Sequence, residues 1–166
     1  SDGSLDLSQE LTKEKDIEVV PFYVSFDSET YQKEMVEVGV REFYQEMVDH
    51  PTVFPKTSMP SVHDYYEVFE KHAKEKMPVI CICITKKFSG SLQSATTAKD
   101  MILEEYPDAQ ITVIDSTVNT VLQGLYVLEA CRLRDMGLEY QQIVDALLPI
   151  RETARIFFTI GSIDNL

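Results

Sequence analysis

Two short segments rich in hydroxyl side chains could together bind an anion. The first is K56-T-S-M-P-S61, and the second is K86-K-F-S-G-S91, which follows the apolar run V79-I-C-I-C-I84. Each stands just before a stretch with helical periodicity. The first turn of a helix offers unpaired backbone N–H groups and a partial positive charge, and hydroxyl groups add donors without burying a charge. A carboxylate or a phosphate suits such a place.

Both segments also have a simpler interpretation as helix caps. Ser61 with Asp64 three residues later resembles a capping box, and Ser89 or Ser91 could cap the next helix. Capping would explain either segment taken singly. The occurrence of two such segments in one chain is more informative than either, and it keeps an anion site as a hypothesis.

An alternation of helices and strands would position these two segments. Helices are predicted over residues 8–15, 40–48, 61–73, 91–105, 118–136 and 140–148, and strands over 17–26, 78–85, 111–115 and 155–160. Residues 27–38 and the proline-rich stretch 51–60 are expected to be irregular, and Pro149 is expected to end the last helix. This order predicts an α/β fold with a parallel sheet, in which ligands bind outside the carboxyl ends of the strands. The turns that precede Ser91 and follow Asp115 should both lie at that edge.

The composition indicates one domain with a real core, or one domain and part of another. The chain has 166 residues, 44% of them hydrophobic, and a net charge of −13 from 15 basic and 28 acidic residues. Such acidity disfavours nucleic acid and anionic membrane surfaces. We expect neither a membrane span nor a signal peptide. Cys81, Cys83 and Cys131 form no C-x-x-C pair, so buried thiols in a reducing compartment are expected rather than disulfides or a zinc site.

Intrinsic catalysis has little support in the sequence. It contains no G-x-S-x-G, no P-loop and no G-x-G-x-x-G. A hydrolase would need a base beside a nucleophile, and His50, His63 and His72 show neither that placement nor a metal-binding spacing. Lys86 and Lys87 could meet a phosphate. A phosphate- or nucleotide-binding domain therefore stays an alternative, as do a small-molecule hydrolase and a pure interaction module.

Seven short stretches carry a resemblance to a known family. In chain order they are D2-G-S-L-D-L7 with Glu10-Leu11 following, I17-E-V-V-P21, E42-F-Y44, K56-T-S-M-P-S61, F88-S-G-S-L-Q-S-A95, V113-I-D-S116 and L128-E-A130. The pair T-S-x-P-S and S-G-[ST]-x-Q-S-A is specific. The sequence resembles the DegV family of fatty-acid-binding proteins over nearly its whole length.

The resemblance implies a domain division and a partial chain. Residues 1–153 would form the N-terminal α/β domain, with its first strand missing, and residues 154–166 would begin a second α/β domain. Family chains begin with a strand ahead of the turn that matches residues 2–7, and they run on well beyond this C-terminus. Between Ser116 and Gly124 the family has smaller residues than those found here, notably Val118, Val121 and Leu122.

The resemblance also implies a function. Family members hold one long-chain fatty acid, such as palmitate, stearate or oleate, with the tail buried and the carboxylate bound by hydroxyl groups. The carboxylate-binding threonine falls on Thr57 and the serine on Ser89, with Ser58, Gly90 and Ser91 as neighbours in the same motifs. In bacteria with a fatty acid kinase system, the protein presents the acyl chain to the kinase catalytic protein, which phosphorylates the carboxylate.

The expected protein is therefore a bacterial, cytoplasmic lipid carrier and not itself an enzyme. No metal, cofactor or nucleic acid is expected, and its partners would be the fatty acid, the kinase and, transiently, a membrane. Residues that could line the tail are inferred from the pattern of apolar positions: Ile82, Ile84, Leu92, Leu122 and Leu125.

Overall fold

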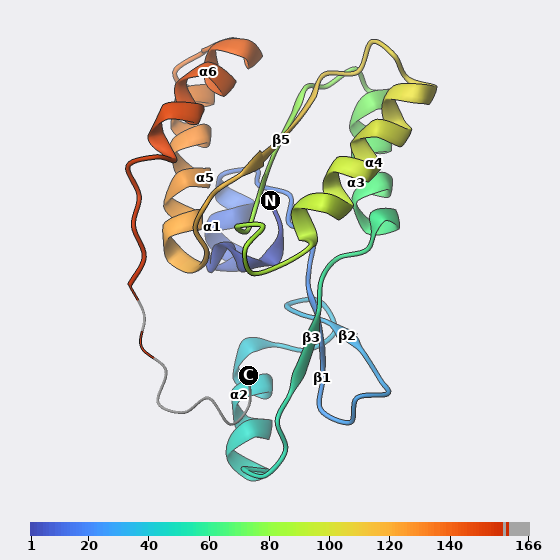
Figure 1. Ribbon diagram of the computed structural model, residues 1–166, viewed down its shortest axis with the longest axis vertical. Helices are drawn as coiled ribbons and strands as arrows, with labels where there is room; N and C mark the ends of the chain where they lie inside the picture. The colour runs from blue at the N-terminus through green and yellow to red at the C-terminus, as the bar shows by residue number, and fades with distance from the viewer. Residues whose placement is uncertain (158, 160–166) are drawn as a thin grey trace.

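The computed structural model describes residues 1–157 and residue 159, and it has a larger and a smaller lobe (Figure 1). The larger lobe contains η1 (Gly3–Leu5), α1 (Gln9–Glu14), α3 (Val62–Lys74), β4 (Val79–Cys83), α4 (Ser91–Glu105), β5 (Ile111–Asp115), α5 (Thr120–Asp135) and α6 (Tyr140–Ile150). The smaller lobe contains β1 (Tyr23–Ser25), β2 (Gln32–Lys33), α2 (Val40–Asp49) and β3 (Lys56–Ser58).

A parallel pair of strands forms the centre of the larger lobe. β4 and β5 pair in register from Val79 opposite Ile111 to Cys83 opposite Asp115. Helices α3 and α4 cover one side of this pair, and α5 and α6 cover the other (Figure 1). Because both faces are buried, β4 reads as a continuous apolar run rather than as an alternation. The predicted α/β fold with a parallel sheet is confirmed.

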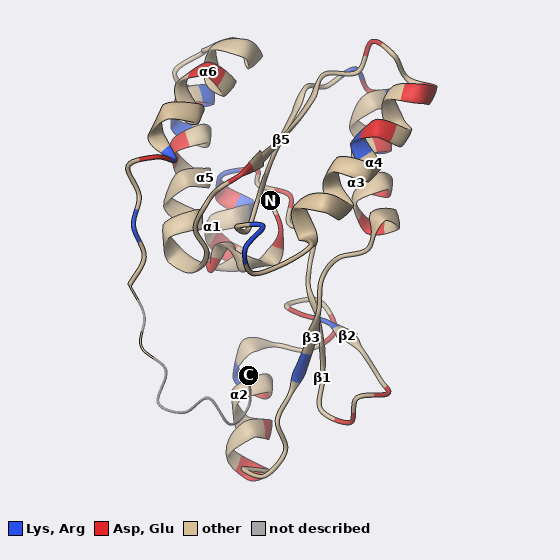
Figure 2. Ribbon diagram, viewed as in Figure 1, with Lys and Arg blue, Asp and Glu red and all other residues tan. Residues whose placement is uncertain are grey.

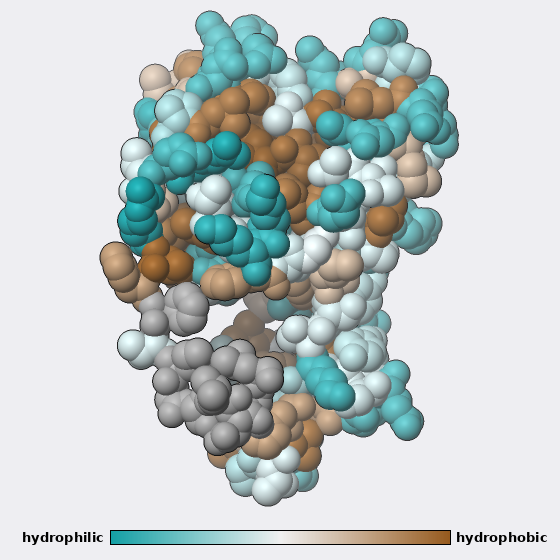
Figure 3. Space-filling model, in the orientation of Figure 1, coloured by the Kyte–Doolittle hydropathy of each residue, from teal (hydrophilic) through white to brown (hydrophobic). Residues whose placement is uncertain are grey.

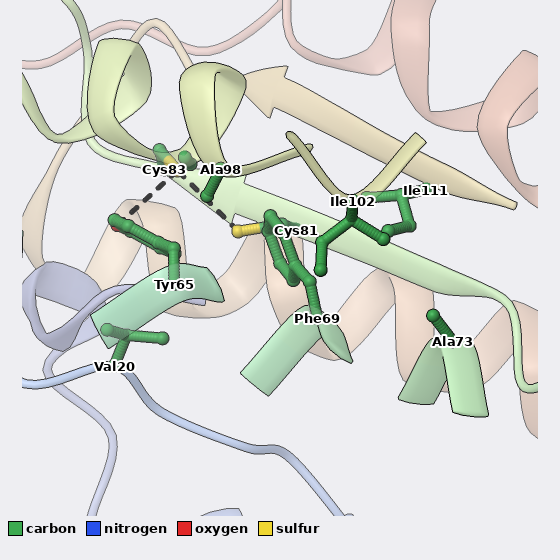
Figure 4. Packing of buried hydrophobic residues seen from close by; sticks show 10 residues of the cluster. Val20, Tyr65, Phe69, Ala73, Cys81, Cys83, Ala98, Ile102 and Ile111 are labelled. Carbon is green, nitrogen blue, oxygen red and sulfur yellow. Dashed lines mark hydrogen bonds between the residues drawn. The ribbon is translucent and has the colours of Figure 1, made fainter. Parts of the chain in front are cut away.

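The core beneath α3 and α4 contains two of the cysteines. Tyr65 and Phe69 pack against Cys81 and Cys83, while Ile82 points to the other face (Figure 4). The two sulfur atoms are 3.7 Å apart. Contact with the Cys81 thiol and burial together raise the pKa of Cys83, so it stays a thiol. The prediction of buried, unpaired thiols is confirmed for Cys81, Cys83 and Cys131.

A short antiparallel sheet forms the smaller lobe, and here the sequence-based expectation was wrong. Its order is β2-β1-β3, with Tyr23 opposite Ser58 and Val24 opposite Thr57. The sequence predicted one long strand over 17–26 and loops over 27–38 and 51–60. Pro21 lacks a backbone donor and separates β1 from a single bridge at Val20. β3 has no apolar alternation of its own, so it is a strand only because β1 pairs with it.

The helices agree better with the sequence, apart from two ends. α5 begins at Thr120 rather than Val118, because the Val118 carbonyl accepts the Thr85 N–H at 2.9 Å. α6 continues through Pro149 to Ile150, because a proline near the end of a helix removes only one hydrogen bond from its last turn. Of the strand predicted over 155–160, residues 155–157 and 159 are not in a strand, and the others lie outside the described residues.

Helix α2 has the amphipathic pattern that the sequence predicts, but its apolar side is not buried. Tyr44 is 61% exposed and Val48 is 70% exposed, whereas Phe43 contacts the ring of Phe26 at 5.1 Å between centroids. Apolar side chains gather on the surface over α2, and again between the two helical layers of the larger lobe (Figure 3).

Replacement of Gly124 by alanine should destabilise the fold. Alanine normally stabilises a helix by about 1 kcal/mol relative to glycine. At Gly124 in α5, however, an added Cβ would clash with the Leu5 carbonyl oxygen and the Leu7 side chain. We expect Gly124→Ala to lower the free energy of unfolding by about 1–3 kcal/mol in chemical denaturation. Gly39→Ala is the control, because a Cβ there meets no atom within 4 Å; an equal or smaller loss for Gly124→Ala would contradict the close approach.

The Asp64 carboxylate should stabilise the junction of the two lobes in a pH-dependent way. It accepts hydrogen bonds from Ser61 N–H at 2.8 Å and from Tyr23 Oη at 2.8 Å, and Lys33 Nζ lies 3.4 Å away. Burial alone would raise the pKa of Asp64, but these groups outweigh burial and leave the pKa below its ordinary value.

Asp64→Asn should therefore lower the free energy of unfolding by about 1 kcal/mol at neutral pH. A carboxylate with a lowered folded-state pKa stabilises the fold fully above its unfolded-state pKa, and that stabilisation is lost as the pH falls through the folded-state pKa. The difference between wild type and Asp64→Asn should shrink below about pH 4 in denaturation curves measured across pH. A difference that stays constant down to pH 2 would contradict this assignment.

Candidate functional site

The predicted site residues lie on two elements that face the junction of the lobes. Thr57 and Ser58 are exposed on β3, in the smaller lobe. Ser89 and Gly90 lie in the turn between β4 and α4, and Ser91 is the first residue of α4. This turn follows the carboxyl end of a parallel strand, which is the edge where the sequence analysis places ligands.

The two hydroxyl-rich segments meet at Gly90. A Cβ added to Gly90 would lie 2.7 Å from the sulfur of Met59, the residue that follows Ser58. Glycine at this position therefore allows the turn to approach the end of β3 closely. The capping box of Ser61 and Asp64 fixes the chain just beyond Met59. The capping interpretation of Ser61 is thus correct, and the cap itself helps to hold the segment in place.

Ser89 presents its hydroxyl as a hydrogen-bond donor. Its Oγ accepts the backbone N–H of Ser91 at 3.1 Å, so this oxygen is partly satisfied from inside the turn. Gly90, not Ser89 or Ser91, is the N-cap residue of α4. Among residues 1–157 and 159, no acceptor takes the hydroxyl hydrogen of Ser89. That hydrogen is free to point toward an acceptor such as a carboxylate oxygen.

Ser91 has a different environment from the other hydroxyl groups. It is fully buried, and its Oγ donates to Asp2 Oδ2 at 2.7 Å. The Tyr65 hydroxyl lies 2.6 Å from the same Oγ. Burial raises the pKa of Tyr65, so its hydroxyl keeps its proton. Ser91 therefore holds the turn from beneath, while Ser89 faces outward.

The buried carboxylate of Asp2 is a site component that sequence reasoning did not single out. Asp2 is 0% exposed, and it accepts the Ile84 N–H at 2.9 Å and the Gln123 amide at 2.8 Å. Ser4 Oγ donates to Asp2 Oδ1 at 2.7 Å, the same oxygen that accepts the Gln123 amide. The sequence signal was an aspartate followed by glycine and serine, which is typical of a turn or cap. Its partners are 82 and 121 residues away, and only the fold brings them together.

Basic residues surround the candidate site in an otherwise acidic chain. Figure 2 shows basic residues on β3 and in the turn that leads into α4. These are Lys56 on β3 and Lys86 and Lys87 in the turn, all with exposed side chains. With a net charge of −13 for the whole chain, this local positive charge favours an anionic ligand at the junction of the lobes.

A neighbouring turn contributes one more polar group. Asn119 lies between β5 and α5, in the turn that the sequence placed at the same edge as Ser89. Its side-chain oxygen is buried and has no hydrogen-bond partner within the described part of the chain. The backbone of this turn is tied to the end of β4 through Thr85 N–H and the Val118 carbonyl. The turn after Asp115 was expected at this edge from the sequence, but Asn119 was not identified as a site residue.

The residues suggested for the acyl tail are divided between core and surface. Ile82 is 2% exposed within the packed cluster beneath α5 and α6, although it also lines a groove beside β4. Leu125 is 55% exposed on α5, beside a cavity of about 210 Å³ that Leu122 also lines. The tail-lining residues stay a prediction.

A larger groove of about 440 Å³ runs along the free edge of β4, between α3 and α5. Ser1 lies at one end of it, as part of a strand-like pairing. Its N–H group donates to the Glu18 carbonyl at 3.0 Å, its carbonyl accepts the Val20 N–H at 2.9 Å, and its Oγ donates to the Ile82 carbonyl at 2.8 Å. The strand expected ahead of residue 2 stays a prediction.

The histidines pair with glutamates and not with the candidate site. His50 lies near Glu46, His63 near Glu67, and His72 Nε2 is 2.8 Å from Glu18. Across residues 1–157 and 159, no histidine hydrogen-bonds to Thr57 or Ser89, and no group of acidic, histidine and cysteine side chains could hold a metal ion. Within the same residues, no helix has the length and apolar character that a membrane crossing requires.

Comparison with known proteins places this geometry in a family. A family model described as "Uncharacterised protein, DegV family" matches residues 1–166. A DegV domain-containing protein from Clostridium perfringens is 29% identical over 166 residues, which is 100% of this chain and 58% of the relative.

Two solved structures share the fold and come from proteins described by their ligand. A fat acid (stearic acid)-binding protein from Eubacterium ventriosum is 46% identical with a TM-score of 0.84, covering 88% of this chain and 50% of that one. A DegV family protein from Thermus thermophilus, described by its fatty acid binding, is 30% identical with a TM-score of 0.75, covering 91% of this chain and 51% of that one.

The comparisons confirm the resemblance and the α/β fold inferred from the sequence. They also show that the chain spans about half the length of the proteins that it matches. Because the family model matches every residue from 1 to 166, the chain belongs to the DegV family.

Proposed function

We propose that the protein binds a long-chain fatty acid, whose carboxylate is held by Thr57 and Ser89 with Ser58, Gly90 and Ser91 forming the supporting turns. The contact between Gly90 and Met59 supports this proposal most strongly, because it brings two hydroxyl-rich segments from different lobes to one place. Two structural relatives are described as binding fatty acids. The basic residues around the junction would attract the ligand's negative charge.

The donors at the site match the chemistry of a fatty acid head group. A carboxylate placed against apolar surface must receive hydrogen bonds, or it takes up a proton instead. Ser89 offers a free hydroxyl hydrogen, and the Thr57 hydroxyl forms no hydrogen bond with any described residue. Each buried CH₂ of the tail would contribute about 0.8 kcal/mol, so the tail supplies most of the affinity and the hydroxyl groups select the head group.

We further propose that the protein is a carrier in the cytoplasm and leaves the chemistry to a partner. Within the described residues the histidines pair with glutamates and not with Ser89 or Thr57, which does not favour either hydroxyl as an activated nucleophile. A bound acyl chain such as palmitate, stearate or oleate would be presented to a fatty acid kinase, which would phosphorylate the exposed carboxylate. Any membrane contact would be transient and would serve loading and release of the acyl chain.

The complete protein that contains this chain should carry its ligand through purification. Solvent extraction followed by mass spectrometry should find near-stoichiometric long-chain fatty acid, and the protein alone should turn over neither esters nor phosphates. An empty extract, with no thermal shift on adding oleate or palmitate, would overturn the proposal. A thermal shift with inorganic phosphate or ATP instead would move the assignment to a phosphate-bearing ligand near Lys86 and Lys87.

Loss of either hydroxyl should weaken binding without unfolding the protein. A hydrogen bond to a charged group contributes about 1.5–3 kcal/mol, so Ser89→Ala and Thr57→Ala should each raise the Kd for oleate by about tenfold or more. Thr52→Ala, at an exposed threonine of the smaller lobe, is the matched control and should leave the Kd unchanged. Calorimetry measures the Kd and thermal unfolding checks the fold. Unchanged lipid retention by the Ser89→Ala, Thr57→Ala double variant would refute the site assignment.

A further inference from the structure

We propose that Asp2 is a positioning residue that sets the direction of the Ser89 hydroxyl through a chain of hydrogen bonds across Ser91 and Tyr65. This inference rests on the proposed function, because it concerns the donor that the bound carboxylate would meet. Ser91 is the link: its hydroxyl donates inward to Asp2, and its backbone N–H donates outward to Ser89.

The first step fixes the Asp2 carboxylate. It is fully buried and receives the Ile84 N–H, at the end of β4, and the Gln123 amide, on α5. It is therefore anchored to the end of β4 and to α5. The hydroxyl groups of Ser91 and Ser4 donate to it.

The second step fixes the hydrogen positions at Ser91. Its hydroxyl hydrogen is given to Asp2 Oδ2 at 2.7 Å. The Tyr65 hydroxyl, 2.6 Å from the same Oγ, must then be the donor in that pair. Tyr65 keeps its proton because it is buried, and its ring is held in the α3–α4 core beside Phe69 (Figure 4). Ser91 thus has no hydroxyl hydrogen left for a ligand, and its side chain is held from two sides.

Ser91 in turn fixes one hydrogen bond of Ser89. With Ser91 held in place, its backbone N–H is aimed at Ser89 Oγ at 3.1 Å. That oxygen has accepted one hydrogen bond, and no described residue accepts the hydroxyl hydrogen, so the Ser89 hydroxyl can donate to a ligand. A site prepared in this way favours an ionised carboxylate, which is an acceptor, over a ligand that offers an N–H group. Preorganisation of a donor reduces the cost of binding.

A double-mutant cycle separates this role from simple stabilisation of the fold. The four proteins are the complete wild-type protein, Tyr65→Phe, Ser89→Ala and the double variant, and the Kd for oleate is measured for each. Tyr65→Phe removes one hydroxyl and keeps the ring. It should weaken binding by about three- to tenfold in the wild-type background and have no further effect when Ser89 is already alanine.

Tyr66→Phe is the control for the loss of a tyrosine hydroxyl from α3. Tyr66 Oη donates to Glu105 Oε1 at 2.9 Å, between α3 and α4. This variant should leave the Kd unchanged. Ser91→Ala provides a second route into the same cycle, and thermal unfolding of every variant shows whether the fold is retained.

The remaining outcomes distinguish a failure of the positioning role from a failure of the fatty acid site. Equal weakening by Tyr65→Phe in both backgrounds, or no weakening by Tyr65→Phe or Ser91→Ala alone, would overturn the positioning role while leaving the fatty acid site intact. An unchanged Kd for Ser89→Ala would overturn both the proposed site and the positioning role. Non-additive loss through Tyr65 and through Ser91 would establish the chain of hydrogen bonds from Asp2.

Discussion

The buried carboxylate of Asp2 is the interaction on which the larger lobe depends most. It connects the N-terminal segment to the end of β4, the first turn of α4 and the first turn of α5. Removing a carboxylate from water is costly unless donors replace the lost hydration, and here an N–H, an amide and hydroxyl groups do so. Gly124 lets α5 approach the N-terminal segment closely enough for Gln123 to reach this carboxylate. The turn that follows β4 is rigid because its base is tied at several points.

The smaller lobe is held by fewer and more exposed contacts. Asp64 joins Tyr23 and Lys33 to the start of α3, and Met59 lies against Gly90. Its sheet is short, and the apolar side of α2 is largely exposed. The candidate site therefore combines a rigid turn, which presents Ser89, with a less constrained strand, which presents Thr57.

Local sequence was sufficient where one element's own pattern decides the structure. Residues 91–105 were predicted as a helix with the bounds that α4 has, and the apolar run V79-I-C-I-C-I84 lies in the strand predicted over 78–85, where β4 is found. β3 could not be predicted, because the pattern of Lys56 to Ser58 is not apolar and its strand conformation depends on β1. The burial of Ser91 depends on Asp2, 89 residues away, so a serine in the motif could not be assigned to the inner or outer side of the turn.

Because Thr57 and Ser89 lie on different lobes, the affinity for a ligand that contacts both would depend on how the two lobes are held together. A ligand that hydrogen-bonds to both Thr57 and Ser89 would connect the two lobes, and part of its binding free energy would be used to hold β3 against the turn. Residues that hold the junction, such as Asp64, would then influence affinity by changing how easily the two lobes come together. Under the proposed function, a variant that weakens the junction would also weaken lipid binding.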